Sequence, residues 1–218
     1  MRLTKEQAEQ NRHLIVETAS RMFRLHGMEN VSVADIMKES GFTHGGFYNH
    51  FKSKDALAAE AIASAFDGVA SDLSEKLASG KHPQESLSSF VARYLSPPHR
   101  DTKSGGCPAS ALSVDAARDG KTVQTAFVKG IETYLDIIAA QMGGDEQEAR
   151  QQAIALFSGL VGAMMLSRAV KKSDPTLSDE LLSSTRKTLK LRNEICRRHA
   201  ITVCISSRRL RRPRVSRD

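Results

Sequence analysis

The sequence predicts an all-α protein, with a small N-terminal domain of three helices followed by a larger helical domain. Three observations lead to this prediction. Apolar residues recur at intervals of three and four along most of the 218-residue chain, as on one face of a helix. Glycine, proline and capping residues divide the chain into about nine such segments. No segment alternates between apolar and polar residues as a half-buried strand would.

The first two helices are indicated by their apolar positions and by the residues at their ends. Residues 12–26 form the first helix, and Gly27 suits the position just after a helix end. One face of this helix carries Ile15, Ala19, Met22 and Phe23. Ser32 is a favourable N-cap for the second helix, and Asp35 gives a weaker form of the capping box. The buried positions of this second helix are Val33, Ile36 and Met37.

A glycine turn joins the second helix to a third. Gly41 supplies the turn, and Thr43 is the predicted N-cap of a helix whose core positions are Phe47 and Phe51. Ser53 caps the fourth helix. Two short helices joined in this way form a helix-turn-helix, in which the second helix of the pair enters the major groove of DNA.

The third helix is too polar on its exposed face to belong to a core. Its exposed side chains, with the turn that follows, are Thr43, His44, Gly46, Tyr48, Asn49, His50, Lys52 and Lys54. Hydroxyl, imidazole and ammonium groups suit phosphate oxygens and base edges. Gly45 and Gly46 allow the backbone to approach bases, but each weakens the helix by roughly 1 kcal/mol relative to Ala. We therefore expect this helix to be loose until DNA orders it.

Residues 12–63 resemble the DNA-binding domain of TetR/AcrR-family transcriptional repressors. The segment FTHGGFYNHFKSKDAL is similar to that family's signature, a Tyr-x-His-Phe core followed by a short basic turn and Lys-Asp. The resemblance implies phosphate contacts by Ser32, Thr43, Tyr48, His50 and Lys54. It implies base contacts by His44, Gly45, Gly46 and Asn49. It also implies a homodimer on a palindromic double-stranded DNA operator, and a small-molecule effector that moves the helix starting at Lys54 and so separates the two recognition helices.

Net charge does not by itself support a DNA-binding function. The formal charge of +7 lies wholly in residues 192–218, where nine arginines stand against Glu194 and Asp218. Residues 1–191 are neutral overall. The local motif, rather than the overall pI, therefore carries the prediction of DNA binding.

Other features favour a cytoplasmic protein that is not an enzyme. The N-terminus lacks the apolar run of a signal peptide, and the longest apolar stretch, 153–166, is shorter than a membrane span. Three widely spaced cysteines indicate a reducing compartment rather than a disulfide framework. We find no metal-ligand spacing, phosphate loop, dinucleotide fingerprint or catalytic triad pattern, and expect no cofactor.

The predicted domains are a helix-turn-helix domain at 1–53, a ligand-binding and dimerisation domain at 54–191, and a basic tail at 192–218. The second domain should contain helices at 54–79, 82–95, 108–118, 121–142, 145–170 and 178–192, with a polar loop at 99–106. Residues 153–166 are apolar nearly all round, and Leu177, Leu181, Leu182 and Leu189 offer a partner stripe. These two helices are the predicted dimer interface. The alternative is that both pack wholly within one subunit.

Cys107 is the candidate for redox or electrophile sensing. It precedes Pro108 at the start of a helix, where the N-terminus lowers the pKa of a thiol. Its GGCP element resembles one branch of the family, which includes regulators of multidrug export and of electrophile or quinone stress. The alternative is a buried small residue at a helix start. Charged residues are not concentrated in this domain, so we expect an apolar or aromatic ligand, or an electrophilic effector where Cys107 is the sensor. Further candidates for its pocket are Phe66, Phe90, Tyr94, Phe127 and Tyr134.

The tail changes composition abruptly and has no amphipathic period. It could be a DNA-binding arm or a non-native extension, and we expect it to be dispensable for fold and specific recognition.

Two other functions remain open at this point. A constitutive DNA-binding protein would have no large apolar pocket, and a redox enzyme using Cys107 would turn over thiol substrates.

Overall fold

The computed structural model describes residues 4–78, 83–102 and 104–189, which form nine α-helices and one short 3-10 helix. The elements are α1 (Lys5–His26), α2 (Val33–Glu39), the 3-10 helix η1 (His44–Asn49), α3 (Lys54–Ala78), α4 (Pro83–Tyr94), α5 (Pro97–Asp101), α6 (Pro108–Arg118), α7 (Lys121–Ala139), α8 (Glu146–Val170) and a last helix at 175–189. The all-α prediction is confirmed, and these described ranges contain no strand.

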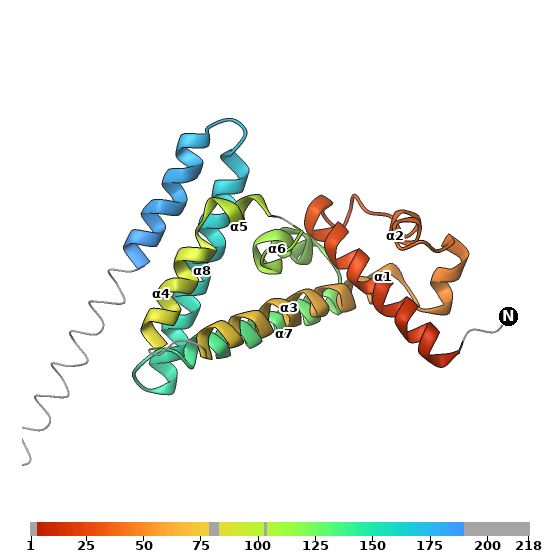
Figure 1. Ribbon diagram of the computed structural model, residues 1–218, viewed down its shortest axis with the longest axis horizontal. Helices are drawn as coiled ribbons and strands as arrows, with labels where there is room; N and C mark the ends of the chain where they lie inside the picture. Colours follow the sequence, from red (N-terminus) through yellow and green to blue (C-terminus); the bar gives the residue numbers. More distant parts are fainter. Residues whose placement is uncertain (1–3, 79–82, 103, 190–218) are drawn as a thin grey trace, which may run out of the picture.

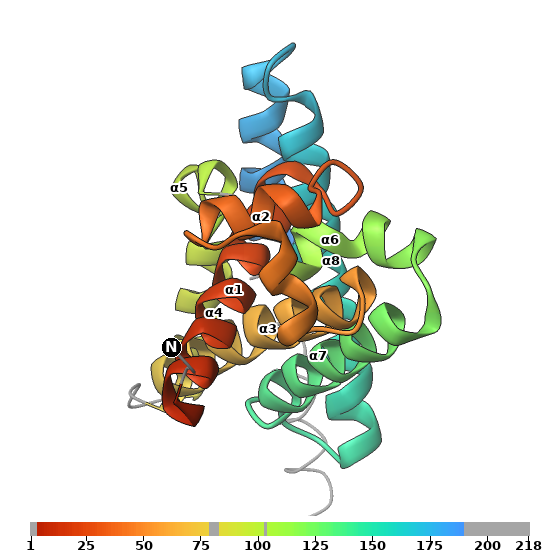
Figure 2. The same cartoon turned by 90° about the vertical axis from the view of Figure 1, so that its right-hand side faces the viewer.

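The helices are arranged so that α3 runs from the N-terminal helices into the larger bundle (Figure 1). α1, α2 and η1 lie at one end of the molecule, and α8 with the helix at 175–189 lies at the other. α3 and α7 pack along one another through the middle, and α6 lies beside this pair and next to α1 (Figures 1 and 2). α3 and α6 are therefore the two elements through which the larger bundle contacts α1.

The N-terminal helices share a small apolar core. Ile15, Phe23, Ile36, Phe47 and Leu57 are each no more than 1% exposed. At the edge of this core, Arg12 forms a bidentate ion pair with Glu60 on α3, with one N–O distance of 2.6 Å. The Arg12 guanidinium also lies 4.5 Å from the centre of the Phe51 ring. This arginine therefore joins α1 to α3 directly beside the turn that follows η1.

Local signals predicted most of the helix ends correctly. Ser32 and Asp35 form a reciprocal capping box, and the Ser53 hydroxyl accepts from the Ala56 N–H. Gly27 and Gly41 have φ angles of +81° and +82°, in the left-handed region that disfavours residues with a Cβ. Both turns therefore depend on glycine.

Four predicted boundaries were wrong. α1 begins at Lys5 rather than residue 12, because Thr4 and Gln7 form a capping box further upstream. The third helix is 3-10, and the Thr43 side chain makes no capping bond. The polar loop contains α5, which Ser96 caps and which accepts Pro97 at its first position. The last helix starts at 175, where Asp174 accepts from the Leu177 N–H. The tail prediction, with Cys196 and Cys204, falls outside the described residues.

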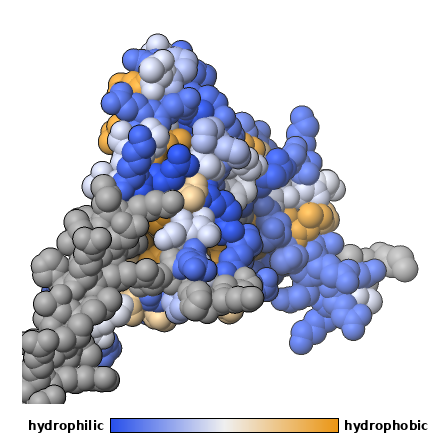
Figure 3. Space-filling model, turned by 60° about the vertical axis from the view of Figure 1, so that its left-hand side comes forward, coloured by the Kyte–Doolittle hydropathy of each residue, from blue (hydrophilic) through white to orange (hydrophobic). Residues whose placement is uncertain are grey.

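α8 is the one helix in the described ranges that is long and apolar enough to span a membrane by composition. Leu156, Phe157, Leu160 and Met164 are buried against the rest of the bundle, as in the core helix of a soluble protein. Other apolar residues remain exposed, and Figure 3 shows apolar patches interrupting a mostly hydrophilic surface near the end where α8 meets the helix at 175–189. The exposed apolar residues of these two helices include Ile154, Leu166 and Leu177.

Candidate DNA interface and effector cavity

η1 presents a polar surface held on a fixed apolar base. Phe47 is buried, and its ring stacks on Phe51 at a centroid distance of 5.5 Å. Tyr48 meets the Phe47 ring edge-on at 5.2 Å, yet 69% of Tyr48 is exposed. This arrangement directs the phenol away from the core while the aromatic pair fixes its position.

The predicted DNA contacts gather on this end of the molecule. The exposed ones are Ser32, Thr43, His44, Gly45, Tyr48 and Asn49, while Gly46, His50 and Lys54 are half-buried. A Cβ at Gly45 would meet no neighbouring atom, so the backbone there is open to approach. The arrangement offers hydroxyl, imidazole and amide groups on one surface, with Lys52 exposed beside it. It suits phosphate oxygens and base edges.

Two of the predicted phosphate contacts also have structural roles. The Lys54 ammonium donates to the carbonyl of Met28 over 2.7 Å, which joins the start of α3 to the end of α1. An ammonium has three donors, so two remain for phosphate. The Ser32 hydroxyl donates to the Asp35 carboxylate over 2.5 Å and accepts from the Asp35 N–H. The Ser32 hydroxyl and the Ser32 N–H both donate to the Asp35 carboxylate, which lowers the pKa of Asp35 and keeps the carboxylate ionised at the N-terminus of α2.

The larger bundle contains a cavity of about 220 Å³ between α3, α4, α7 and the segment that leads into α6. Its walls include four of the predicted pocket residues: Phe90, Tyr94, Cys107 and Tyr134. Phe66 and Phe127 do not line it. They pack edge-on against each other at 5.3 Å between α3 and α7, and Phe66 lies against Gly130. These two residues belong to the core.

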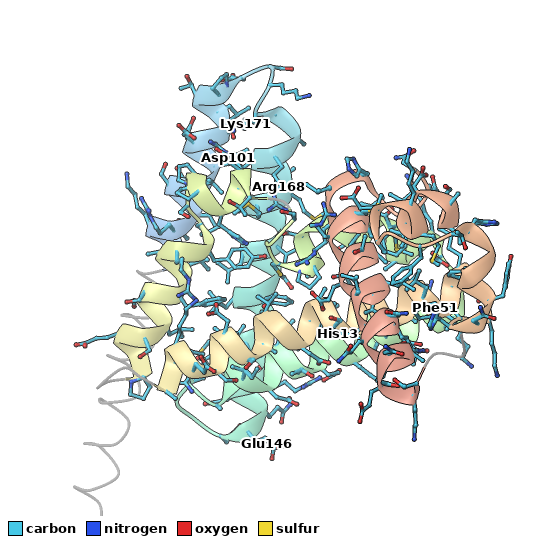
Figure 4. All side chains as sticks on the ribbon, turned by 45° about the vertical axis from the view of Figure 1, so that its right-hand side comes forward. His13, Phe51, Asp101, Glu146, Arg168 and Lys171 are labelled. Carbon is cyan, nitrogen blue, oxygen red and sulfur yellow. The ribbon has the colours of Figure 1, made fainter. Side chains whose placement is uncertain are left out.

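The prediction that charges are not concentrated around this pocket was wrong. Asp72, Lys76 and Arg93 line the cavity, and Asp72 and Lys76 form an ion pair. Behind it, Arg168 donates to the carbonyls of Arg100 and His99 and to the Ser110 hydroxyl, all within 3.1 Å. Figure 4 places Arg168 where α8 passes α5. Sequence patterns do not predict this cluster, because Arg168 and Ser110 are 58 positions apart and only the fold brings them together.

His99 orders the segment between α5 and α6. Its Nδ1 lies 2.8 Å from the carbonyl of Tyr94, and its Nε2 lies 3.3 Å from the Cys107 N–H. The first contact needs a proton on Nδ1 and the second a lone pair on Nε2, so the ring is neutral. Burial lowers the pKa of His99, with a further contribution from Arg168. The ring thus fixes Cys107 at the cavity wall.

The expected lowering of the Cys107 pKa was also wrong. Cys107 does occupy the N-cap of α6, but it is only 1% exposed, and this burial raises the pKa of its thiol. The nearby Tyr94 hydroxyl and the N–H groups of Ser110 and Ala109 favour the thiolate, but they offset only part of that effect. A neutral, buried thiol is a poor nucleophile.

We predict that Cys107 reacts slowly in the folded protein. In a variant with Cys196→Ser and Cys204→Ser, maleimide labelling near pH 7 should be much slower than for a denatured control, and it should accelerate as pH rises above 9. The rise follows from a raised pKa, because the thiolate forms only at higher pH. Rapid labelling at pH 7 would show instead that the thiol is activated.

α6 connects this cavity to the N-terminal helices. Near its start, Arg24 on α1 donates to the carbonyl of Gly106 over 3.2 Å. Two turns later, the Asp115 carboxylate accepts the N–H of Met28 over 2.7 Å, just after the end of α1. A change in the position of α6 would therefore act on α1 at two points.

Comparison with known proteins gives matches over both parts of the chain. The family described as bacterial regulatory proteins, tetR family, matches residues 15–61, and the LmrA/YxaF-like C-terminal domain of transcriptional regulators matches residues 83–178. The uncharacterized HTH-type transcriptional regulator YxaF of Bacillus subtilis is 28% identical over 77% of this chain and 90% of its own length. The HTH-type transcriptional regulator LmrA of the same organism is 24% identical over 77% of this chain and 91% of its own.

Solved structures agree on the fold. The reduced form of NemR from E. coli superimposes with a TM-score of 0.71 at 18% identity, over 83% of this chain and 95% of that one. The exposed polar surface of η1, the two matching domains and the shared helical architecture lead to one conclusion. The chain belongs to the TetR family of DNA-binding transcriptional regulators.

Proposed function

We propose that this regulator is a cytoplasmic homodimeric repressor, which binds a palindromic operator and is released by a small molecule in the cavity beside Cys107. The observation that carries the proposal is the position of that cavity. It lies between α3, which begins in the N-terminal domain, and the segment that opens α6. Both helices contact α1, so a ligand there can act on the DNA-binding surface.

The apolar surface of the last two helices supports a dimer. Gly159 and Gly162 are small and half-buried on α8, and a Cβ at Gly162 would meet no atom within the subunit. A second α8 could therefore approach closely at this point. Leu166 on α8 and Leu177 on the next helix remain exposed in the single chain, at 57% and 40%. A two-fold pair of recognition segments would then read a two-fold operator.

Reversible binding of a ligand explains effector action better than a covalent reaction of the effector with Cys107. The thiol is buried and its pKa is raised, so it has little thiolate near neutral pH. A ligand shifts the equilibrium only if it binds the DNA-free arrangement more tightly than the DNA-bound one. The cavity also argues against a constitutive DNA-binding protein, because such a protein needs no ligand site.

Substitutions on η1 test the DNA-binding assignment. Tyr48→Ala should weaken binding to all DNA sequences by about ten- to a hundredfold, since the phenol is assigned to a phosphate and hydrogen bonds to charged groups contribute about 1.5–3 kcal/mol. His44→Ala should instead change the preferred sequence, because its imidazole is assigned to bases. Gel-shift titrations at fixed salt on operator and scrambled DNA measure both effects. Unchanged affinity of the Tyr48→Ala protein would refute the assignment, and the exposed α7 substitution Lys129→Ala is the control.

A further inference from the structure

Two buried hydroxyl groups at the cavity have no hydrogen-bond partner in the described ranges of the chain. Tyr94 is 4% exposed and Tyr134 is 1% exposed, and the Oη atom of each lacks an acceptor or donor among the described residues. A buried hydroxyl without a partner costs about 1–3 kcal/mol. Such groups are therefore uncommon, and here two of them line the same cavity.

The two phenol rings are held firmly in place. Tyr94 packs edge-on against His99 at 4.6 Å and against Phe90 at 5.8 Å. Tyr134 packs against Phe66 at 5.9 Å and against Phe157 at 5.2 Å. Rotation of either ring towards another partner would break these contacts. The Tyr94 hydroxyl lies close enough to the Cys107 thiol and the Ser110 hydroxyl for both to shift the pKa of Tyr94. Neither group, however, is placed to form a geometrically complete hydrogen bond with it.

The charges around the cavity are positive in balance. Asp72 and Lys76 neutralise each other, which leaves Arg93 on the wall without a carboxylate partner among the described residues. Arg24 and Arg168, half-buried behind Cys107, donate their hydrogen bonds to carbonyl and hydroxyl oxygens, and neither forms an ion pair with a carboxylate in the part of the chain that the structure describes. The N–H groups at the start of α6 add to this field, because a helix N-terminus carries partial positive charge.

We propose that the cavity binds a small amphipathic anion, with an apolar body against Leu73 and Phe90 and an anionic oxygen, such as a carboxylate, that accepts hydrogen bonds from Tyr94 and Tyr134. The volume of about 220 Å³ suits one fused or substituted ring rather than a long chain. The class of ligand thus differs from the purely apolar effector that the composition suggested. Binding of this anion does not depend on the proposed function; only its role as the effector does.

Two readouts on the DNA-free full chain test the inference. Tyr94→Phe and Tyr134→Phe should leave the thermal midpoint unchanged or raise it, because each removes a buried hydroxyl that has no partner. The same variants should bind naphthalene-2-carboxylate about ten- to a hundredfold more weakly by calorimetry, since each loses a hydrogen bond to a charged acceptor. Tyr48→Phe changes the one remaining tyrosine of the chain and should alter neither readout.

Three matched ligands distinguish the contribution of a hydrogen-bond acceptor to affinity from the contribution of negative charge. Naphthalene-2-carboxylate should bind more tightly than the carboxamide, and 2-methylnaphthalene should bind most weakly. Arg93→Gln should reduce the preference for the carboxylate over the amide. Equal affinity of carboxylate and amide would overturn the anionic assignment, as would no binding of monocarboxylates from butyrate to naphthoate at millimolar concentration. A lower midpoint of either Tyr→Phe variant would show that its hydroxyl has a structural partner. If the ligand binds but does not release the protein from DNA, the proposed function is wrong and the inference about the ligand still stands.

Discussion

Replacing Gly130 by Ala is expected to destabilise the protein by about 3 kcal/mol or more, the upper end of the usual cost of overpacking a core. Gly130 lies on α7 where that helix packs along α3, and a Cβ there would overlap the Phe66 ring. Phe66 is 1% exposed and lies edge-on to both Phe127 and Tyr134, so its ring has no free space to enter. Chemical denaturation of the variant measures the loss.

A second substitution checks the cause of this effect. Phe66→Leu removes the ring that the new methyl group would meet, although it leaves space in the native core. The double variant Gly130→Ala with Phe66→Leu should therefore be more stable than the sum of the two single losses predicts. Additive losses would show that the cost at Gly130 does not come from Phe66. Gly68→Ala, at an exposed position on α3 where a Cβ would meet no atom, is the matched glycine control.

Replacing Asp115 by Ala is expected to lower the free energy of unfolding by about 2 kcal/mol and to weaken operator binding. The Asp115 carboxylate accepts a hydrogen bond from the Met28 N–H. This bond joins the second half of α6 to the residues just after α1. Without it, the orientation of the N-terminal helices relative to the larger bundle is less fixed. The Met28 amide should then lose protection from hydrogen exchange in the native protein.

Asp115→Asn is the control for this prediction, because the amide oxygen of Asn can still accept from Met28. It should retain most of the stability and the operator affinity. If Asp115→Ala loses stability but binds the operator as tightly as the wild type, α6 does not set the orientation of the DNA-binding surface.

Local sequence signals predicted several caps and turns of the N-terminal helices correctly. Ser32, Gly27, Gly41 and Ser53 act within a few residues of their own position, and each was identified correctly. The third helix became a 3-10 helix, in keeping with the weakening expected from Gly45 and Gly46. The predicted helix at 82–95 and polar loop at 99–106 leave out α5, because a proline pair both ends one helix and favours the start of the next.

The cavity could be predicted only in part, because its chemistry depends on contacts between distant segments. Aromatic residues in the second domain were good candidates, yet only the fold separates Tyr94 and Tyr134 from Phe66 and Phe127. Arg24 reaches Gly106 across 82 positions of sequence. Burial is a property of the folded chain, and it reverses the pKa shift that the helix N-terminus alone predicts for Cys107.

Selection of DNA from a random pool by the full chain tests the central claim most directly. The account predicts enrichment of an inverted repeat bound by two chains, because one recognition segment per subunit requires two equivalent half-sites. The Tyr48→Ala protein should enrich the same sequence with lower recovery, and the His44→Ala protein should enrich a different one. An asymmetric single site, or no enrichment above the input pool, would contradict the account.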